Sequence, residues 1–233
     1  MVKKEKTEEQ PKNLTDNVET PPLSSTERFI EENQKTFVYG VIVIVVLVLA
    51  IIGYVRFIRT PHIHQAWEEA YKAEFYFERD SFRLALYGDG FFPGFLDVID
   101  DYGRTPMGNA SRYYAGVCYM RLGDYDEAIR HLKRFKSNDP MVGAMAMGII
   151  GDANVELGNY NEAVKYYINA VNKAENELIS PTFLMKAAKV YEEMGEYQEA
   201  LKLYERIKTE YYGTSEQHNV EKFIKRAELL SKQ

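Results

Sequence analysis

A six-residue pattern, Gly-x-Tyr-x-x-Ala, occurs three times in the C-terminal half of this chain and constrains its fold more than any other feature. The copies begin at Gly123, Gly158 and Gly195, which places them 35 and 37 residues apart. Self-similarity at a period near 34 residues is typical of repeated pairs of helices. A bulky apolar residue follows each alanine by four positions, namely Leu132, Tyr167 and Tyr204.

Each residue of the pattern has a structural role. Glycine readily adopts the left-handed conformation that commonly ends a helix, so the first helix of each unit is expected to stop at these glycines. A small residue earlier in that helix lets the two helices of a pair approach closely, and Gly116, Gly151 and Ala188 occupy that position. A single pair buries too little apolar surface to be stable, so the pairs are expected to stack into a solenoid.

The first copy also has Gly116, Tyr119 and Pro140 at the positions that the tetratricopeptide-repeat (TPR) pattern requires, and the third copy keeps Tyr191. The chain therefore resembles the TPR family. The resemblance implies a solenoid of helical pairs. Together with the apolar segment Phe37–Val55, we expect an all-α protein in which a single N-terminal transmembrane helix is followed by a TPR solenoid of about four helical pairs and a C-terminal capping helix. The resemblance also implies that the protein binds other proteins.

The segment from Phe37 to Val55 contains 19 residues without a charged or strongly polar side chain. As a helix it would be about 28 Å long, which matches the hydrocarbon core of a bilayer. Tyr39 and Tyr54 lie near its ends, where aromatic residues are enriched. A cleaved signal peptide is disfavoured because the apolar run begins late and no small-x-small cleavage site follows it. We predict one membrane span over residues 36–59.

Charge near the span does not set its orientation. Arg28 and Lys35 precede the apolar run, and Arg56, Arg59 and Lys72 follow it. This bias is nearly flat, and large domains cross membranes largely regardless of it, so both orientations remain open on this evidence.

The expected organisation has eight segments. The N-terminal tail is polar and contains few apolar residues, so we expect it to be disordered. Ser24 and Glu27 form a candidate capping box that opens a short helix. The predicted segments are a disordered charged tail (1–23), a juxtamembrane helix (24–35), the transmembrane helix (36–59), a degenerate first helical pair (61–108), three TPRs (109–143, 144–180 and 181–213) and a capping helix (214–233).

Several functions are disfavoured by composition and motifs. The net charge of −6 argues against a general nucleic-acid partner. Cys118 is the single cysteine and is interpreted as a core residue. His62 and His64 do not share a helical face, so they are not a convincing metal site. The Gly88-Asp89-Gly90 loop lacks the ligands of a calcium or phosphate loop and is interpreted as a connector. We expect no catalytic residue, cofactor, metal ion or small-molecule substrate.

A TPR solenoid usually binds its ligand along the concave side, which the first helix of each pair lines. Methionine and tyrosine side chains there suit an adaptable surface for apolar segments. An equally weighted alternative is that the C-terminal helix or the first pair fills this groove. A clamp for an acidic C-terminus is disfavoured, because Tyr113, Val117 and Ile149 replace its Lys and Asn residues. The candidate groove residues are Tyr113, Val117, Met120, Arg121, Met145, Asp152, Val155, Glu156, Met185, Lys189, Glu192 and Glu193.

The layout and four short segments resemble a narrower family, the YfgM-type ancillary subunits of the bacterial SecYEG translocon, in the form found in Bacteroidota-like sequences. The segments are Ser81–Gly90, Gly94–Leu96, Tyr113–Gly116 and Gly151–Ala153. The resemblance implies a single-pass inner-membrane protein with a cytoplasmic N-terminus and periplasmic TPRs. Its implied partners are a SecYEG-type translocon, periplasmic chaperones and nascent secreted chains.

Two alternatives remain open. The protein could be a scaffold of another envelope machine, for secretion, gliding or outer-membrane assembly, or a cytosol-facing receptor anchored in a membrane. An outer-membrane lipoprotein is disfavoured because no cysteine lies near the N-terminus.

Overall fold

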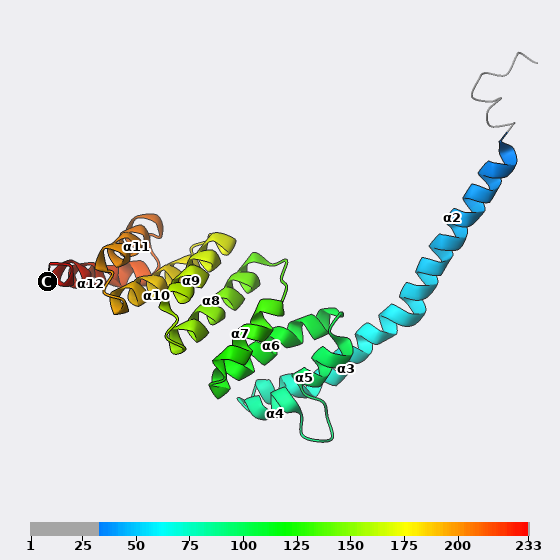
Figure 1. The fold of residues 1–233 in the computed structure, drawn as a ribbon, viewed down its shortest axis with the longest axis horizontal. Helices are drawn as coiled ribbons and strands as arrows, with labels where there is room; N and C mark the ends of the chain where they lie inside the picture. The colour runs from blue at the N-terminus through cyan, green and yellow to red at the C-terminus, as the bar shows by residue number, and fades with distance from the viewer. Residues whose placement is uncertain (1–32, 233) are drawn as a thin grey trace, which may run out of the picture. The chain divides into compact units, whose positions relative to one another are not determined.

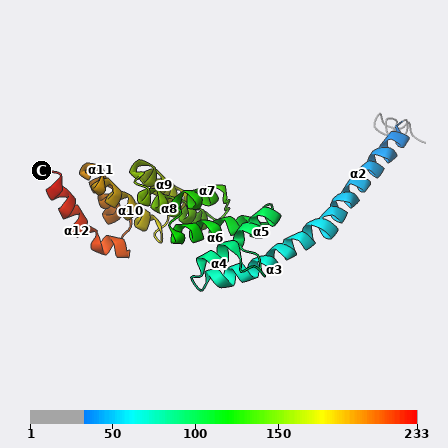
Figure 2. The same ribbon diagram turned by 60° about the horizontal axis from the view of Figure 1, so that its bottom comes forward.

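The computed structural model describes residues 33–232 and divides the chain into two units that meet between Tyr54 and Val55 (Figures 1 and 2). Every regular element within residues 33–232 is helical, which confirms the all-α prediction. The predicted disordered tail (1–23), the candidate capping box at Ser24 and Glu27, and most of the predicted juxtamembrane helix (24–35) lie outside the described residues.

Within the first unit, residues 33–54 are described, and they contain the helix α2 (Gln34–Tyr54). None of its residues is buried, and most of its large apolar side chains are about half exposed. The helix therefore has apolar side chains on all of its sides and no buried face of its own. By length and composition α2 is able to cross a membrane, and it belongs to the one helical stretch in residues 33–232 that passes this test.

The second unit begins with a five-residue π-helix, η1 (Val55–Arg59), followed by α3 (Thr60–Phe77). The π-helix comes directly before Pro61, which lies in the first turn of α3. Proline lacks an N–H group, and its ring clashes with the carbonyl four residues earlier. The wider turn accommodates the proline, and the Thr60 hydroxyl donates to the Val55 carbonyl at 2.9 Å.

The first helical pair has a divided second helix. Helix α3 packs against two short helices, α4 (Phe82–Tyr87) and α5 (Phe95–Tyr102), with the loop 88–94 between them. Phe95 lies fully buried in the core of this pair, where its ring stacks on that of Tyr114 at 4.9 Å between centroids. The backbone at Gly94 comes so close to Leu86 that a Cβ there would lie 2.4 Å from the Leu86 carbonyl oxygen. Glycine therefore lets the two ends of the loop approach each other.

Asp89 holds the loop 88–94 in place. Its carboxylate accepts hydrogen bonds from the Tyr76 hydroxyl at 2.6 Å and from the Phe91 and Phe92 amides at 2.9 and 2.8 Å. These donors favour the charged carboxylate, and the bond from Tyr76 contributes most, so the pKa of Asp89 is lowered to about 2. This loop is a connector that is anchored to α3.

The acid sensitivity of this loop is a testable consequence. A carboxyl whose pKa is lower in the folded state than in the unfolded state stabilises the folded state. This stabilisation is fully present above the unfolded pKa of 3.8 and is lost as the pH falls towards the folded pKa of about 2. We expect the protection of the amides in residues 88–94, measured as hydrogen exchange relative to the intrinsic rate at each pH, to fall below about pH 4. In Asp89→Asn the exchange should be faster at neutral pH and should lose this acid dependence. Equal exchange in both proteins at neutral pH would contradict the anchoring role.

Three helical pairs follow (Figure 1). Thr105 and Asp139 cap α6 and α8 with their side-chain oxygens, and a proline occupies the first turn of each helix. These caps explain why both helices begin before the predicted repeat boundaries at 109 and 144. The pairs are α6 (Pro106–Leu122) with α7 (Tyr125–Arg134), α8 (Pro140–Glu156) with α9 (Tyr160–Ala174), and α10 (Ser180–Glu193) with α11 (Tyr197–Glu210).

The glycines of the repeated pattern adopt the conformation expected for them. Gly123, Gly158 and Gly195 have φ values of 83°, 74° and 77°, each in the left-handed region. A Cβ at Gly151 would lie 2.5 Å from the Tyr167 ring. The small residue in the first helix of the repeat therefore permits the close approach that the pattern predicts.

The last helix, α12 (Ser215–Leu230), packs against α10 and α11. Its buried side is formed by Val220, Ile224 and Ala227, whereas Glu221 and Lys225 are exposed. This combination gives the solenoid the polar terminal surface that a capping helix provides.

Candidate functional site

The structure places the twelve predicted groove residues on the first helices α6, α8 and α10, but it does not leave them equally accessible. Five are exposed: Arg121, Met145, Glu156, Lys189 and Glu193. Six are partly buried: Tyr113, Val117, Met120, Asp152, Val155 and Glu192. Met185 is buried.

Two apolar side chains predicted for ligand contact pack within the solenoid instead. Met185 is 8% exposed because it belongs to the core shared by the second and third repeats. The Tyr113 ring lies 5.3 Å from the Phe135 ring and packs against the cluster that joins the first two repeats. Met145, at 44% exposure, is the methionine that remains available on this side.

Three polar side chains predicted for the groove contact a neighbouring helix of the solenoid instead, either α10 or the capping helix α12. Asp152 accepts from the Lys186 ammonium at 2.7 and 2.8 Å and from the Tyr167 hydroxyl at 2.6 Å. Burial and this hydrogen bond raise the pKa of Tyr167. Glu192 pairs with Arg226 of α12, and the Lys189 ammonium lies 5.3 Å from the centre of the Phe223 ring. Both pairs join positions 34 residues apart: Asp152–Lys186 links two neighbouring repeats, and Glu192–Arg226 links the last repeat to α12.

We expect Asp152→Ala to lower the free energy of unfolding by about 1 kcal/mol, because it removes the acceptor for Tyr167 and Lys186. The estimate is kept small because the side chains of Asp152 and Lys186 are 32% and 37% exposed, and solvent screens such pairs. Urea denaturation measures the change. Lys165→Ala is the matched control, since Lys165 forms a more exposed pair within one helix. Equal effects of the two substitutions would contradict the role of Asp152.

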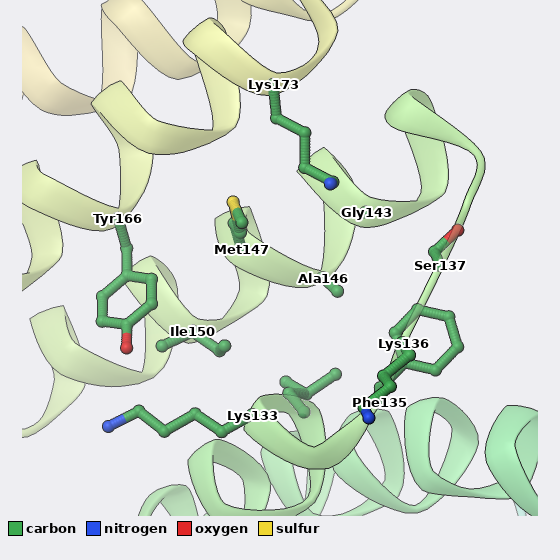
Figure 3. Close-up of a pocket in the computed structure, with 11 residues that line it drawn as sticks. Lys133, Phe135, Lys136, Ser137, Gly143, Ala146, Met147, Ile150, Tyr166 and Lys173 are labelled. Atoms are coloured by element: carbon green, nitrogen blue, oxygen red, sulfur yellow. The ribbon is translucent and has the colours of Figure 1, made fainter.

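A cleft lies between α7, α8 and α9, on a side of α8 that differs from the concave side with Met145 (Figure 3). Helix α7 has 10 residues, whereas α9 and α11 have 15 and 14. After Arg134 the chain leaves the helix, with Phe135 in extended conformation, and residues 135–139 form the connection to α8. The shorter helix leaves a cavity of about 370 Å³.

The floor of the cleft is apolar and its edge is basic. Gly143, Ala146, Met147 and Ile150 share one face of α8 by their spacing, and this face is opposite to that of Met145. Figure 3 shows Lys173 reaching over Gly143 from α9, and Lys133 and Lys136 on the α7 side. The remaining lining residues are Leu132, Phe135, Ser137 and Tyr166.

A second hollow of about 590 Å³ adjoins the cleft and shares Lys133 and Lys136 with it. Arg104, Arg112 and Arg134 add three guanidinium groups to its lining. None of the residues that line the two hollows is an aspartate or a glutamate. The two hollows together bring six cations to one region of the surface, and we call this region the basic cleft.

The first helical pair also carries exposed aromatic side chains that sequence reasoning did not identify. Trp67 and Tyr71 are one helical turn apart on α3 and are 49% and 68% exposed. Phe91 in the loop 88–94 is 92% exposed. The helical spacing of Trp67 and Tyr71 is also typical of a core-facing side, but the buried residues of α3 are Ala66, Ala70 and Ala73.

The remaining sequence candidates carry no site. The His62 ring lies 4.7 Å from the Tyr102 ring. Cys118 is fully buried, and desolvation raises the pKa of its thiol to about 12, so it is an unreactive core residue. Within residues 33–232, no three His, Cys, Asp or Glu side chains are placed to hold a metal ion.

Comparison with known proteins supports the repeat assignment. Residues 110–140 match one tetratricopeptide-repeat model and residues 150–212 match a second. A TPR repeat-containing protein of Methanocaldococcus jannaschii is 28% identical over 131 residues, which are 55% of this chain and 22% of that protein. The chain thus spans about a fifth of the length of this curated relative.

Two solved structures of nearly identical TPR-like repeats, from a kinesin light chain candidate of Podosopora anserina, have the same fold. Each has a TM-score of 0.53 and covers 73% of this chain and 88% of the other, at 18% and 17% identity. At such identity the likeness shows the fold alone. Residues 110–140 and 150–212 therefore match tetratricopeptide repeats, and repeats of this kind are scaffolds for protein–protein interaction.

Proposed function

We propose that this protein is a non-enzymatic adaptor, anchored in a membrane by α2, that binds protein partners on its TPR solenoid. The observation that carries the proposal is the succession, in one chain, of an uncovered apolar helix and a set of TPRs. Lipid is the environment that removes the α2 side chains from water, since no described part of the chain covers them. The solenoid then presents its grooves beside that membrane.

The concave side is the proposed groove for one partner. Met145 contributes an apolar, adaptable contact, and Arg121, Glu156, Lys189 and Glu193 contribute charges of both signs. This mixture suits a segment with apolar and charged residues. The Asp152–Lys186 and Glu192–Arg226 pairs hold neighbouring repeats in register behind it.

The partner we propose is a SecYEG-type translocon, with periplasmic chaperones or nascent secreted chains as ligands of the groove. The protein would lie in a bacterial inner membrane with its TPRs in the periplasm. The support is the resemblance of Ser81–Gly90 and Gly94–Leu96 to YfgM-type subunits, together with the exposed Trp67, Tyr71 and Phe91 on the same helical pair. Exposed aromatic side chains are frequent anchors of protein interfaces.

A pull-down of the full chain in mild detergent, followed by mass spectrometry, tests the partner. We expect subunits of the SecY type to be retained by the intact protein and to be lost when residues 36–59 are deleted. Recovery of a secretion, gliding or outer-membrane assembly complex, with no translocon subunit, would assign the adaptor to that machine instead.

Labelling with a membrane-impermeant maleimide tests the orientation. Leu229→Cys places a thiol at a position of 67% exposure on α12, in a Cys118→Ser background. We expect labelling once the outer membrane is made permeable, without lysis of the inner membrane. Labelling that requires lysis of the inner membrane would establish the cytosol-facing alternative.

A further inference from the structure

We propose that the basic cleft is a second protein-binding site, which takes an acidic segment of a partner with an apolar side chain inserted between α7, α8 and α9. The proposal rests on the proposed function in one respect, namely that the ligands of this chain are proteins. It adds a site that faces away from the concave groove, so the adaptor could hold two partners at once. Three observations carry it: unpaired charge, an apolar pocket and a fixed edge.

The charge of the basic cleft is unbalanced within the described structure. Salt bridges in residues 33–232 involve other cations, such as Lys186 and Arg226, and none involves a cation of the cleft. The chain as a whole carries a net charge of −6, so a cluster of one positive sign is opposite to the average surface. Like charges placed together repel each other, and a bound anionic segment would relieve that repulsion. The six cations are Arg104, Arg112, Lys133, Arg134, Lys136 and Lys173.

The pocket between these cations is apolar and of a size suited to a side chain. Leu132, Ala146 and Ile150 form its floor and are nearly fully buried. Its volume of about 370 Å³ falls in the range of ordinary ligand pockets. An aliphatic or aromatic side chain in it would bury further apolar surface, at about 25 cal/mol per Å². Carboxylates on either side of that residue would meet the lysines at the edge.

The edge of the cleft is held by side-chain hydrogen bonds. The Asn109 amide donates to the Lys136 carbonyl at 2.8 Å, and its oxygen accepts from the Lys136 amide at 3.0 Å. The Arg112 guanidinium donates to the carbonyls of Gly103 and Gly108 at 2.8 and 3.2 Å. These bonds pre-organise the backbone of the connection 135–139 and one guanidinium, which lowers the entropic cost of binding.

The shape favours a protein segment over a lipid surface. A flat anionic bilayer would be met by cations on an outward ridge, whereas Lys133, Lys136 and Lys173 line a hollow with an apolar floor. An extended peptide can place one side chain in such a hollow and keep its carboxylates at the edge. Binding of anionic lipid in place of a peptide is the alternative that the test must distinguish.

The test is fluorescence anisotropy with the full chain in micelles of a neutral detergent. The probe is a fluorescein-labelled peptide in which Leu-Phe is flanked on each side by Asp-Glu. We expect micromolar binding that weakens at least tenfold when the salt rises from about 0.1 M to about 0.5 M. A peptide with Asn-Gln in place of Asp-Glu, and one with Ser-Ser in place of Leu-Phe, should each bind at least tenfold more weakly.

Two variants locate the binding. The combined substitution Lys133→Gln, Lys136→Gln and Lys173→Gln should weaken it at least tenfold, and Met147→Trp should do the same by filling the pocket. The matched control is Lys165→Gln with Lys202→Gln and Lys225→Gln, which removes three exposed lysines on α9, α11 and α12 and should leave affinity unchanged. Circular dichroism shows whether each variant is folded. If Met147→Trp does not fold, the triple lysine variant still tests the proposal.

Three results would overturn the proposal. The first is the absence of binding at millimolar concentration, and the second is an unchanged affinity of the lysine variant for the probe. The third is displacement of the probe by phosphatidylglycerol added to the micelles. The last result would make the basic cleft a lipid site. If the lysine variant still retains a partner complex in a pull-down, the protein is an adaptor even though the basic cleft is not a binding site. Failure of this proposal can therefore be distinguished from failure of the proposed function.

Discussion

Replacing Phe95 by alanine is expected to lower the free energy of unfolding by about 3–5 kcal/mol, the range for truncating a buried aromatic residue. Phe95 is fully buried, and its ring contacts those of Phe77 and Tyr114. Alanine would leave a cavity between α5 and its neighbours, because the close packing of an aromatic cluster relaxes only in part.

Phe91→Ala is the matched control, four residues earlier in the chain. Phe91 is 92% exposed, so its truncation should change stability by less than about 0.5 kcal/mol. Urea denaturation of the full chain in micelles, followed by the fluorescence of Trp67 on α3, reports on this helical pair through the single tryptophan. A loss below about 1 kcal/mol for Phe95→Ala would show that the first pair does not depend on this cluster.

Introducing two arginines at the centre of α2 is expected to release the protein from membranes. Val45→Arg with Val46→Arg should cost about 5–7 kcal/mol of insertion free energy, at about 2.5–3.5 kcal/mol for each arginine at the centre of a span. The introduced guanidinium groups would face lipid, because α2 contains no buried residue. The double substitution should offset most of the gain from the apolar residues of α2.

Alkaline carbonate extraction measures this effect as the fraction of protein retained in the membrane pellet. Leu178→Arg with Leu229→Arg is the control, because it adds the same charges at exposed positions of the solenoid, 71% and 67% accessible. We expect the control to remain in the pellet with the wild type. Equal retention of all three proteins would refute α2 as the anchor.

Much of the fold follows from local sequence signals. The glycines at 123, 158 and 195 end the first helices because only glycine takes the left-handed conformation without strain. The apolar run of α2 has no polar side chain, so a helix without a buried face could be foreseen. The segment between α4 and α5 contains Gly88, Gly90, Pro93 and Gly94, which are local signals for the loop that divides the second helix of the first pair.

The candidate groove was predictable in position but not in accessibility. The repeat register places Asp152, Met185 and Glu192 on the first helices, as the structure does. Whether a side chain there is free depends on the next repeat: Met185 is covered by its neighbours, Asp152 pairs with Lys186, and Glu192 pairs with Arg226. A repeat pattern describes one unit at a time and contains no information about these contacts.

The sequence by itself determined the helical pairs, their turns, their stacking order and the apolar character of α2, because helix termination, close packing and apolar length depend on residues near one another in the chain. Only the tertiary structure decided the basic cleft. It exists because α7 ends at Arg134, and because Arg104, Arg134 and Lys173 come from three separate segments that stacking brings together. Burial, charge pairing and pocket shape are properties of such long-range neighbours, which no local pattern encodes.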